Sequence, residues 1–111
     1  SLTNVSFNRN SAGLHGGGMY IIASTPSITN ASFNENSAVE HGGAILHTDA
    51  GDSVITNATF IDNTAGRFGG AIANFSSSPE MYDVSIEGNL GSSGGAIYNQ
   101  YGRFYQQYSR Q

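Results

Sequence analysis

The residues best suited to chemistry are two histidines that stand in equivalent places of a repeated motif. His15 and His41 are 26 residues apart, and the motif recurs at that distance. If successive copies stack as β-strands, the two imidazoles lie about 4.8 Å apart, close enough to share a metal ion. A metal site needs three or four ligands, but Phe68 and Ser93 occupy the same place in the next two copies. We therefore interpret both as surface histidines and predict no metal and no cofactor.

Acidic residues are candidates for calcium binding and for catalysis. Asp49 and Asp52 flank Ala-Gly in one loop, but calcium loops place more oxygen ligands at tighter spacing. Acid–base cleavage of a polysaccharide needs clustered carboxylates, and no fixed spacing pairs Asp49, Asp52 and Glu80. We therefore predict no catalytic residue and no enzymatic activity. The loops leave one corner of the repeat, and we interpret Asp49, Asp52, Ser77 and Glu80 as contact residues on that face.

The chain of 111 residues consists of about four copies of one motif. The copies align in columns with steps of about 26 residues, and such a period indicates a solenoid. One apolar column contains Phe7, Phe33, Phe60 and Ile86, and another contains Met19, Ile45, Ile72 and Ile97. One polar column contains Asn4, Asn30, Asn57 and Asp83, and another contains Asn10, Asn36, Asn63 and Asn89. A glycine pair precedes the second apolar column in each copy.

The apolar stretches are short, alternate with period two and are interrupted by bends, which is typical of strands. Three strands and three bends per copy predict an all-β fold, a parallel β-helix of about four rungs at 1–27, 28–53, 54–80 and 81–99. The crossover preference of parallel strands predicts that it is right-handed. Residues 100–111 are an aromatic tail, which we expect to be either a cap or the start of an irregular fifth rung.

Each column has a predicted structural role. The phenylalanine and isoleucine columns point inward and stack as a continuous core. The asparagines form hydrogen-bonded ladders and tolerate the left-handed backbone of sharp bends. The glycines provide either a positive φ or room for close backbone approach. On the outside we expect two weak ion pairs between copies, Arg9 with Glu35 and Glu40 with Arg67.

Composition restricts the class of protein. Charged residues make up only 11% and the formal net charge is −4, which argues against a nucleic-acid partner. No apolar run approaches the ~20 residues of a membrane span, so we predict no membrane insertion by this segment. The chain begins inside a repeat, and we expect it to be a piece of a longer protein. Together these features favour a secreted or cell-surface bacterial solenoid.

The motifs also carry a family resemblance. Phe-x-x-Asn occurs at 7–10, 33–36 and 60–63, and Gly-Gly-Ala-Ile occurs at 42–45, 69–72 and 94–97. This combination resembles the repeat of the chlamydial polymorphic outer-membrane proteins and of other bacterial surface β-helix proteins, over residues 2–99. The resemblance implies an autotransporter passenger displayed on the outer membrane that acts as an adhesin, with both motifs involved in adhesion and self-assembly.

We therefore expect a non-catalytic extracellular segment for display and adhesion. Its expected partners are a host-surface protein or glycan, with homotypic assembly as a further mode. The alternative is a fragment of a carbohydrate-active secreted β-helix protein whose catalytic rungs lie outside this segment.

Overall fold

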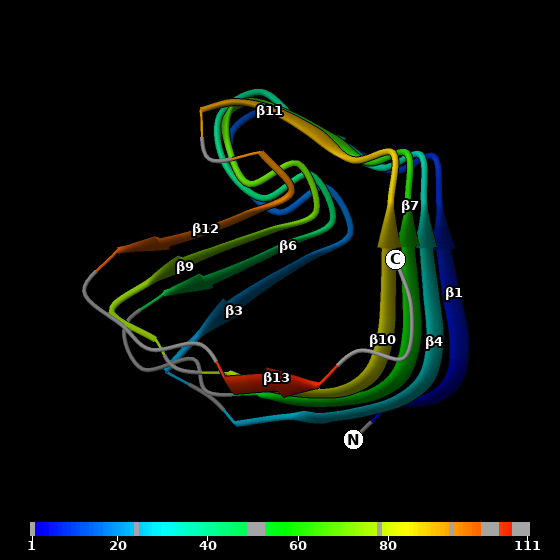
Figure 1. Cartoon of the computed structure of the whole chain (residues 1–111). Helices are drawn as coiled ribbons and strands as arrows, with labels where there is room; N and C mark the ends of the chain where they lie inside the picture. Colours follow the sequence, from blue (N-terminus) through cyan, green and yellow to red (C-terminus); the bar gives the residue numbers. More distant parts are fainter. Residues whose placement is uncertain are drawn as a thin grey trace.

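Every regular element of the computed structural model is a β-strand, and the strands form three parallel sheets (Figure 1). The structure describes residues 2–23, 25–48, 53–77, 79–93, 95–100 and 105–107. The five-stranded sheet contains β1 (Leu2–Asn8), β4 (Ser27–Asn34), β7 (Val54–Ile61), β10 (Glu80–Glu87) and β13 (Tyr105–Gln107). The second sheet contains β2 (Ser11–Ala12), β5 (Ser37–Ala38), β8 (Thr64–Phe68) and β11 (Leu90–Ser93). The third contains β3 (Met19–Ile22), β6 (Ile45–Thr48), β9 (Ile72–Phe75) and β12 (Ile97–Gln100).

Neighbouring strands in each sheet come from successive copies of the motif. The chain passes once through each sheet per copy and then returns to the first sheet one strand further along (Figure 1). Phe33 pairs with Phe60, and Ile45 pairs with Ile72, so each sequence column is also a column in space. The predicted parallel β-solenoid of about four rungs is therefore confirmed. The described part of the tail, β13, pairs in parallel with β10 as the first strand of a further coil would.

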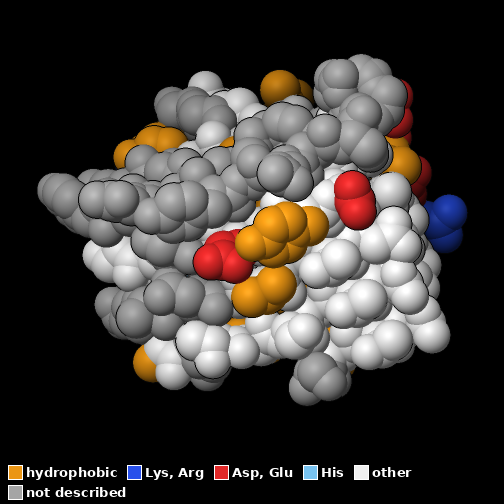
Figure 2. Space-filling view, turned by 60° about the horizontal axis from the view of Figure 1, so that its bottom comes forward, with side chains coloured by type: hydrophobic (Ala, Val, Ile, Leu, Met, Phe, Trp, Pro, Cys, Tyr) orange, Lys and Arg blue, Asp and Glu red, His pale blue; other side chains and the backbone are white. Residues whose placement is uncertain are grey.

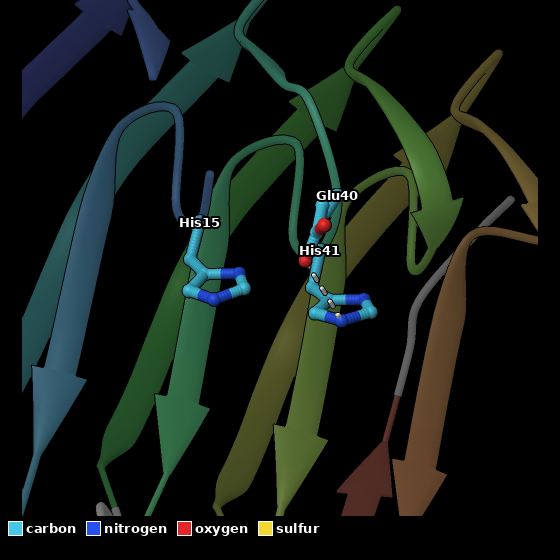
Figure 3. A group of neighbouring side chains, drawn as sticks. All are labelled: His15, Glu40 and His41. Carbon is cyan, nitrogen blue, oxygen red and sulfur yellow. Dashed lines mark ion pairs between the residues drawn. The ribbon is translucent and has the colours of Figure 1, made fainter. Parts of the chain in front are cut away.

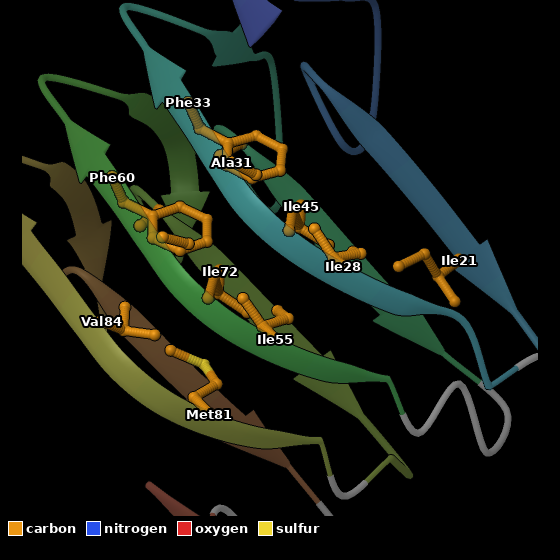
Figure 4. Close-up of a cluster of buried hydrophobic side chains, with 13 residues drawn as sticks. Ile21, Ile28, Ala31, Phe33, Ile45, Ile55, Phe60, Ile72, Met81 and Val84 are labelled. Atoms are coloured by element: carbon orange, nitrogen blue, oxygen red, sulfur yellow. The ribbon is translucent and has the colours of Figure 1, made fainter. Parts of the chain in front are cut away.

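The interior is filled by columns of like side chains (Figure 4). We call Phe7, Phe33, Phe60 and Ile86 the core column. The Phe33 and Phe60 side chains are fully buried, and their rings stack with centroids 4.7 Å apart. A second layer of fully buried side chains comprises Ile28, Ile55 and Met81 on one sheet and Ile45 and Ile72 on another. Phe7, Ile86 and Ile97 pack against this core but are only partly buried, because they lie toward the ends of the described stack.

Two bends of the five-stranded sheet use left-handed backbone. The first bend falls on the expected asparagine column, where Asn30 and Asn57 have φ of 55° and 56°. The second bend falls one residue before the other asparagine column, on Arg9, Glu35 and Asp62, each with φ of 56°. The asparagines that follow this second bend do not have a positive φ, and they use their side chains for hydrogen bonds between coils instead.

In the second and third coils, the two glycines of each pair have different tasks. Gly42 and Gly69 both have φ of 68°, a conformation that glycine adopts without steric cost. Gly43 has an ordinary φ, but a Cβ atom on it would overlap the carbonyl oxygen of Gly70 in the next coil. In these pairs the first glycine therefore provides the positive φ, and the second provides room for close backbone approach.

Candidate functional site

The candidate site is a hollow between the turn that precedes β3 and β6 and the outward side of the third sheet. Its volume is about 300 Å³, and its lining consists of His15, Tyr20, Glu40, His41, Leu46, Thr48 and Phe75. The histidines and Glu40 stand on the turns, whereas the other lining residues stand on β3, β6 and β9. The backbones of His15 and His41 pair in parallel as an isolated bridge, which keeps the two turns in register.

Four rings stack at this corner, and we call His15, His41, Phe68 and Tyr98 the corner column. Parallel pairing aligns the first three, whereas the strand partner of Phe68 in the next coil is Ser93, and the Tyr98 ring reaches Phe68 from β12. The two imidazole centroids are 5.0 Å apart with planes within 7° of parallel, close to the strand spacing expected from the sequence. The His41 ring is also 5.0 Å from the Phe68 ring and nearly parallel to it. Aromatic neighbours therefore hold the His41 ring on more than one side, since Phe75 also contacts it edge-on.

Glu40 joins the two histidines at the hollow (Figure 3). Its Oε1 atom is 3.8 Å from Nε2 of His41, and one potential ligand atom from each of His15, Glu40 and His41 lies within 4.8 Å of the others. We expected Glu40 to pair with Arg67, but the Arg67 guanidinium lies over the Phe68 ring, with its carbon 5.5 Å from the ring centroid. Sequence reasoning followed a single column and so missed Glu40, which directly precedes His41 in the chain.

The electrostatics of the hollow favour the neutral form of the His41 imidazole. The His41 side chain is only 14% exposed, and burial lowers its pKa below the ordinary value of 6.5. Proximity to His15 lowers this pKa further, the Glu40 carboxylate opposes the shift, and Arg67 adds a smaller lowering effect. The Nδ1 atoms of His15 and His41 are buried without a hydrogen-bond partner. Such buried nitrogens are uncommon, because burying a polar atom without a partner is unfavourable.

The second asparagine column is occupied with structural hydrogen bonds. The Oδ1 atom of Asn63 accepts hydrogen bonds from the backbone N–H and the Nδ2 of Asn36, at 2.9 and 3.0 Å. The Nδ2 of Asn63 donates to the Phe33 carbonyl at 3.0 Å and to Asn89 Oδ1 at 2.7 Å. The same pattern links Asn10 to Asn36. Because these amides are used to tie coils together, we assign them no binding role.

The first asparagine column lies on the surface. Asn30 Nδ2 donates to Asn4 Oδ1 at 3.0 Å, and Asn57 Nδ2 donates to Asn30 Oδ1 at 2.5 Å. These three side chains are exposed, so their remaining donor and acceptor positions face solvent. The Arg9 and Glu35 side chains form the expected exposed ion pair nearby, at 3.0 Å.

The structure describes two of the four loop residues named as contacts, Ser77 and Glu80. Glu80 is exposed at the start of β10, where its carboxylate accepts a hydrogen bond from the Tyr82 hydroxyl at 3.0 Å. Ser77 is only 2% exposed and its hydroxyl donates to the Phe75 carbonyl, so its side chain is turned away from the surface. Asp49 and Asp52 lie outside the described residues.

One buried histidine was not expected from the sequence. His47 is fully buried, with Nδ1 2.8 Å from Asn74 Oδ1 and Nε2 2.6 Å from Ser53 Oγ. The signal was its alignment with Asn74 of the next copy, whose amide is also buried, although Ile21 occupies the same place in the first coil. His47 is therefore a structural counterpart of Asn74.

The outer face of the five-stranded sheet carries rows of neutral polar side chains. Strand register aligns one row of Thr3, Thr29, Thr56 and Tyr82 and another of Ser6, Ser32, Thr59 and Ser85. Their side chains are exposed or half-buried, and they alternate with the buried core residues of the same strands. In the space-filling view, much of the described surface is white, the colour of the backbone and of side chains that are neither charged nor hydrophobic, and it borders a small hydrophobic patch with acidic side chains beside it (Figure 2).

Comparison with known proteins supports the resemblance seen in the sequence. Residues 30–48, 57–74 and 83–100 match the Chlamydia polymorphic membrane protein (Chlamydia_PMP) repeat. Each match runs from the first bend of one coil to its strand in the third sheet. No curated protein and no solved structure matches the chain significantly. Within the part that the structure describes, no helix has the length and apolar character needed to cross a membrane. The chain is thus a β-solenoid built from repeats of the Chlamydia polymorphic membrane protein type, a family of bacterial surface and outer-membrane proteins.

Proposed function

We propose that this segment is displayed on a bacterial surface, as part of an autotransporter passenger, and adheres to a host-surface protein or glycan. The observation that carries the proposal is the outer face of the five-stranded sheet. It carries rows of threonine, serine and asparagine, and the threonine row continues to an exposed tyrosine, Tyr82. Tyrosine, serine and asparagine are the residue types enriched in protein-recognition surfaces, where they combine contact area with adaptable hydrogen bonding.

The solenoid also holds this face rigid. The inward side chains of the same strands belong to the core, and the outward asparagines are hydrogen-bonded from coil to coil. Binding to a preorganised surface loses less conformational entropy than binding to a mobile one. Glu80, one of the expected contact residues, stands at the edge of this face beside Tyr82. A polysaccharide-cleaving activity is not expected from this face.

Cell binding tests the proposal. The fluorescently labelled 111-residue chain is incubated with cultured epithelial cells, and bound label is measured with and without excess unlabelled chain. Treating the cells with protease or with glycosidases beforehand separates a protein receptor from a glycan. Sedimentation of the same sample shows whether the chain binds as a monomer or after homotypic assembly.

A pair of variants locates the surface. Thr56→Arg places a bulky charge in the middle of the proposed face, and we expect it to weaken saturable cell binding about tenfold. Thr64→Arg adds the same charge at an exposed position of β8 and is expected to bind as the wild type does. Absence of saturable binding by the wild-type chain, or equal loss in both variants, would rule out adhesion through this face.

A further inference from the structure

The hollow at the corner column is not used by the adhesive face and has a chemistry of its own. His15 comes from the first coil, and Glu40 and His41 come from the second. One potential ligand atom from each lies within 4.8 Å of the others. Glu40 and His41 are adjacent in the chain, whereas His15 reaches the group only because the coils stack in register.

We propose that His15, Glu40 and His41 bind a divalent transition-metal ion of the zinc class. Imidazole nitrogen and carboxylate oxygen are both zinc ligands, and sites with three protein ligands leave a fourth position open to water or another small ligand. Here the fourth position faces the hollow lined by Tyr20 and Thr48. Calcium and magnesium are disfavoured, because they prefer oxygen ligands and this group offers two nitrogens.

The distances require a small closure of the side chains. Zinc bonds of about 2.0–2.2 Å place tetrahedral ligand atoms about 3.3–3.5 Å apart, and Glu40 Oε1 is 3.8 Å from His41 Nε2. Figure 3 shows the two imidazoles side by side, with the Glu40 carboxylate beside the His41 ring. Phe68 and Phe75 hold the His41 ring in place, so metal binding requires the Glu40 side chain and the His15 ring to turn toward it. The hollow, at about 300 Å³, has room for this rotation and for the ion.

The ring nitrogens of the two histidines are a second observation. The Nδ1 atoms of His15 and His41 are buried without a hydrogen-bond partner. A role in ring stacking alone gives no reason for nitrogen atoms here, because the next coil fills the same place with Phe68. Two histidines beside a carboxylate are explained if the nitrogens serve a ligand.

The test measures the melting temperature of the full chain with zinc chloride and with a chelator. Zinc that binds only the folded state raises the melting temperature, and we expect a rise of about 4 °C or more for the wild type at saturation. Calcium and magnesium chloride are expected to produce no shift. Isothermal titration with zinc then gives the dissociation constant and a stoichiometry of about one ion per chain.

Matched variants separate a ligand role from a packing role. His41→Phe copies Phe68 of the same column and keeps a flat ring in the stack, and Glu40→Gln keeps the shape of the side chain. Each is expected to fold, to lose most of the zinc-dependent shift and to weaken zinc binding at least about tenfold. His47→Asn copies Asn74 of its own column, and Glu35→Gln changes a carboxylate of the Arg9 ion pair. Both controls are expected to keep the wild-type affinity for zinc.

The outcomes that contradict the site are also distinct. A wild-type melting temperature that zinc leaves unchanged overturns the proposal. So does wild-type zinc affinity in His41→Phe or in Glu40→Gln, or loss of the shift in His47→Asn. The zinc titration contains no cells and the cell-binding variants leave the histidines intact, so the adhesion and metal proposals succeed or fail independently.

Discussion

The core column and the corner column have nearly the same geometry in different surroundings. Rings stack 4.7–4.8 Å apart in the core and 5.0 Å apart for the histidines at the corner. In both places the spacing follows from parallel strand pairing, which brings equivalent residues of successive coils together. The core column keeps apolar residues because its middle members are fully buried. The corner column changes residue type from coil to coil and includes nitrogen atoms, because it borders an open hollow.

The largest effect is expected from breaking the core column in its middle. Phe33 is fully buried and stacks on Phe7 at 4.8 Å and on Phe60 at 4.7 Å. Phe33→Ala removes both contacts and leaves a cavity that the hydrogen-bonded coils cannot close, so we expect a loss of ~3–5 kcal/mol in the free energy of unfolding. Urea denaturation measures it. A loss below ~1 kcal/mol would show that the stack contributes little to stability.

The buried asparagine column is expected to have the next largest effect. Asn63→Leu leaves the backbone N–H of Asn36 and the carbonyl of Phe33 without their partners. Because both groups stay buried, we expect a loss of ~1–3 kcal/mol by urea denaturation. Asn34→Leu is the control, because the Asn34 Nδ2 donates to Asn8 Oδ1 on the surface, where solvent replaces the lost bond, and it is expected to cost less than Asn63→Leu. An unchanged melting temperature in Asn63→Leu would remove the buried ladder as a source of stability.

The fold was predictable from the sequence because one period specifies both strand register and side-chain direction. The spacing of Phe33 and Phe60 in the sequence is the spacing that places their rings in contact. The second left-handed bend was less predictable. Arg9 and Glu35 are not residue types that favour positive φ, whereas aspartate, at position 62, is one of those that do, and stacking imposes the same conformation on all three. In the fourth coil the equivalent residue is Gly88, with φ of 68°, and a glycine at this position indicates a left-handed bend directly.

The candidate site was only half predictable. The histidine spacing followed from the period, as did the contact between His15 and His41. Glu40 belongs to the neighbouring column, in which Arg67 was its expected ion-pair partner. The path of the turn brings the Glu40 carboxylate to His41 instead. The side-chain direction of Ser77 depends likewise on its local bond to the Phe75 carbonyl. Repeats specify which residues stack, but the loops and turns between strands are not described by the period.

Replacing His41 by phenylalanine makes the corner column resemble the core column, and it changes how stability depends on pH. The pKa of His41 is lowered below 6.5 in the folded protein, so between that lowered pKa and 6.5 the unfolded chain binds more protons than the folded chain. Acidification through this window therefore destabilises the wild type, and above 6.5 the residue has no such effect. His41→Phe removes this contribution. Melting temperatures from about pH 7.5 to about pH 5.5 are expected to fall less in the variant, and equal slopes would contradict the assignment.

The smallest effect is expected where a column faces solvent. The Arg9–Glu35 ion pair links the first two coils at 3.0 Å, but the two side chains are 82% and 55% exposed. Water and salt screen such a pair, and holding two long side chains in place costs entropy, so Arg9→Ala is expected to change the free energy of unfolding by only ~0–1 kcal/mol. Urea denaturation at low and high salt measures this change, which should shrink as salt is added.

A larger loss that persists at high salt would instead point to Arg9 as a residue of the left-handed bend, where φ is 56°. The variant Arg9→Gly would separate the two roles. Glycine removes the ion pair but relieves the bend, so it is expected to be more stable than Arg9→Ala if the backbone conformation dominates.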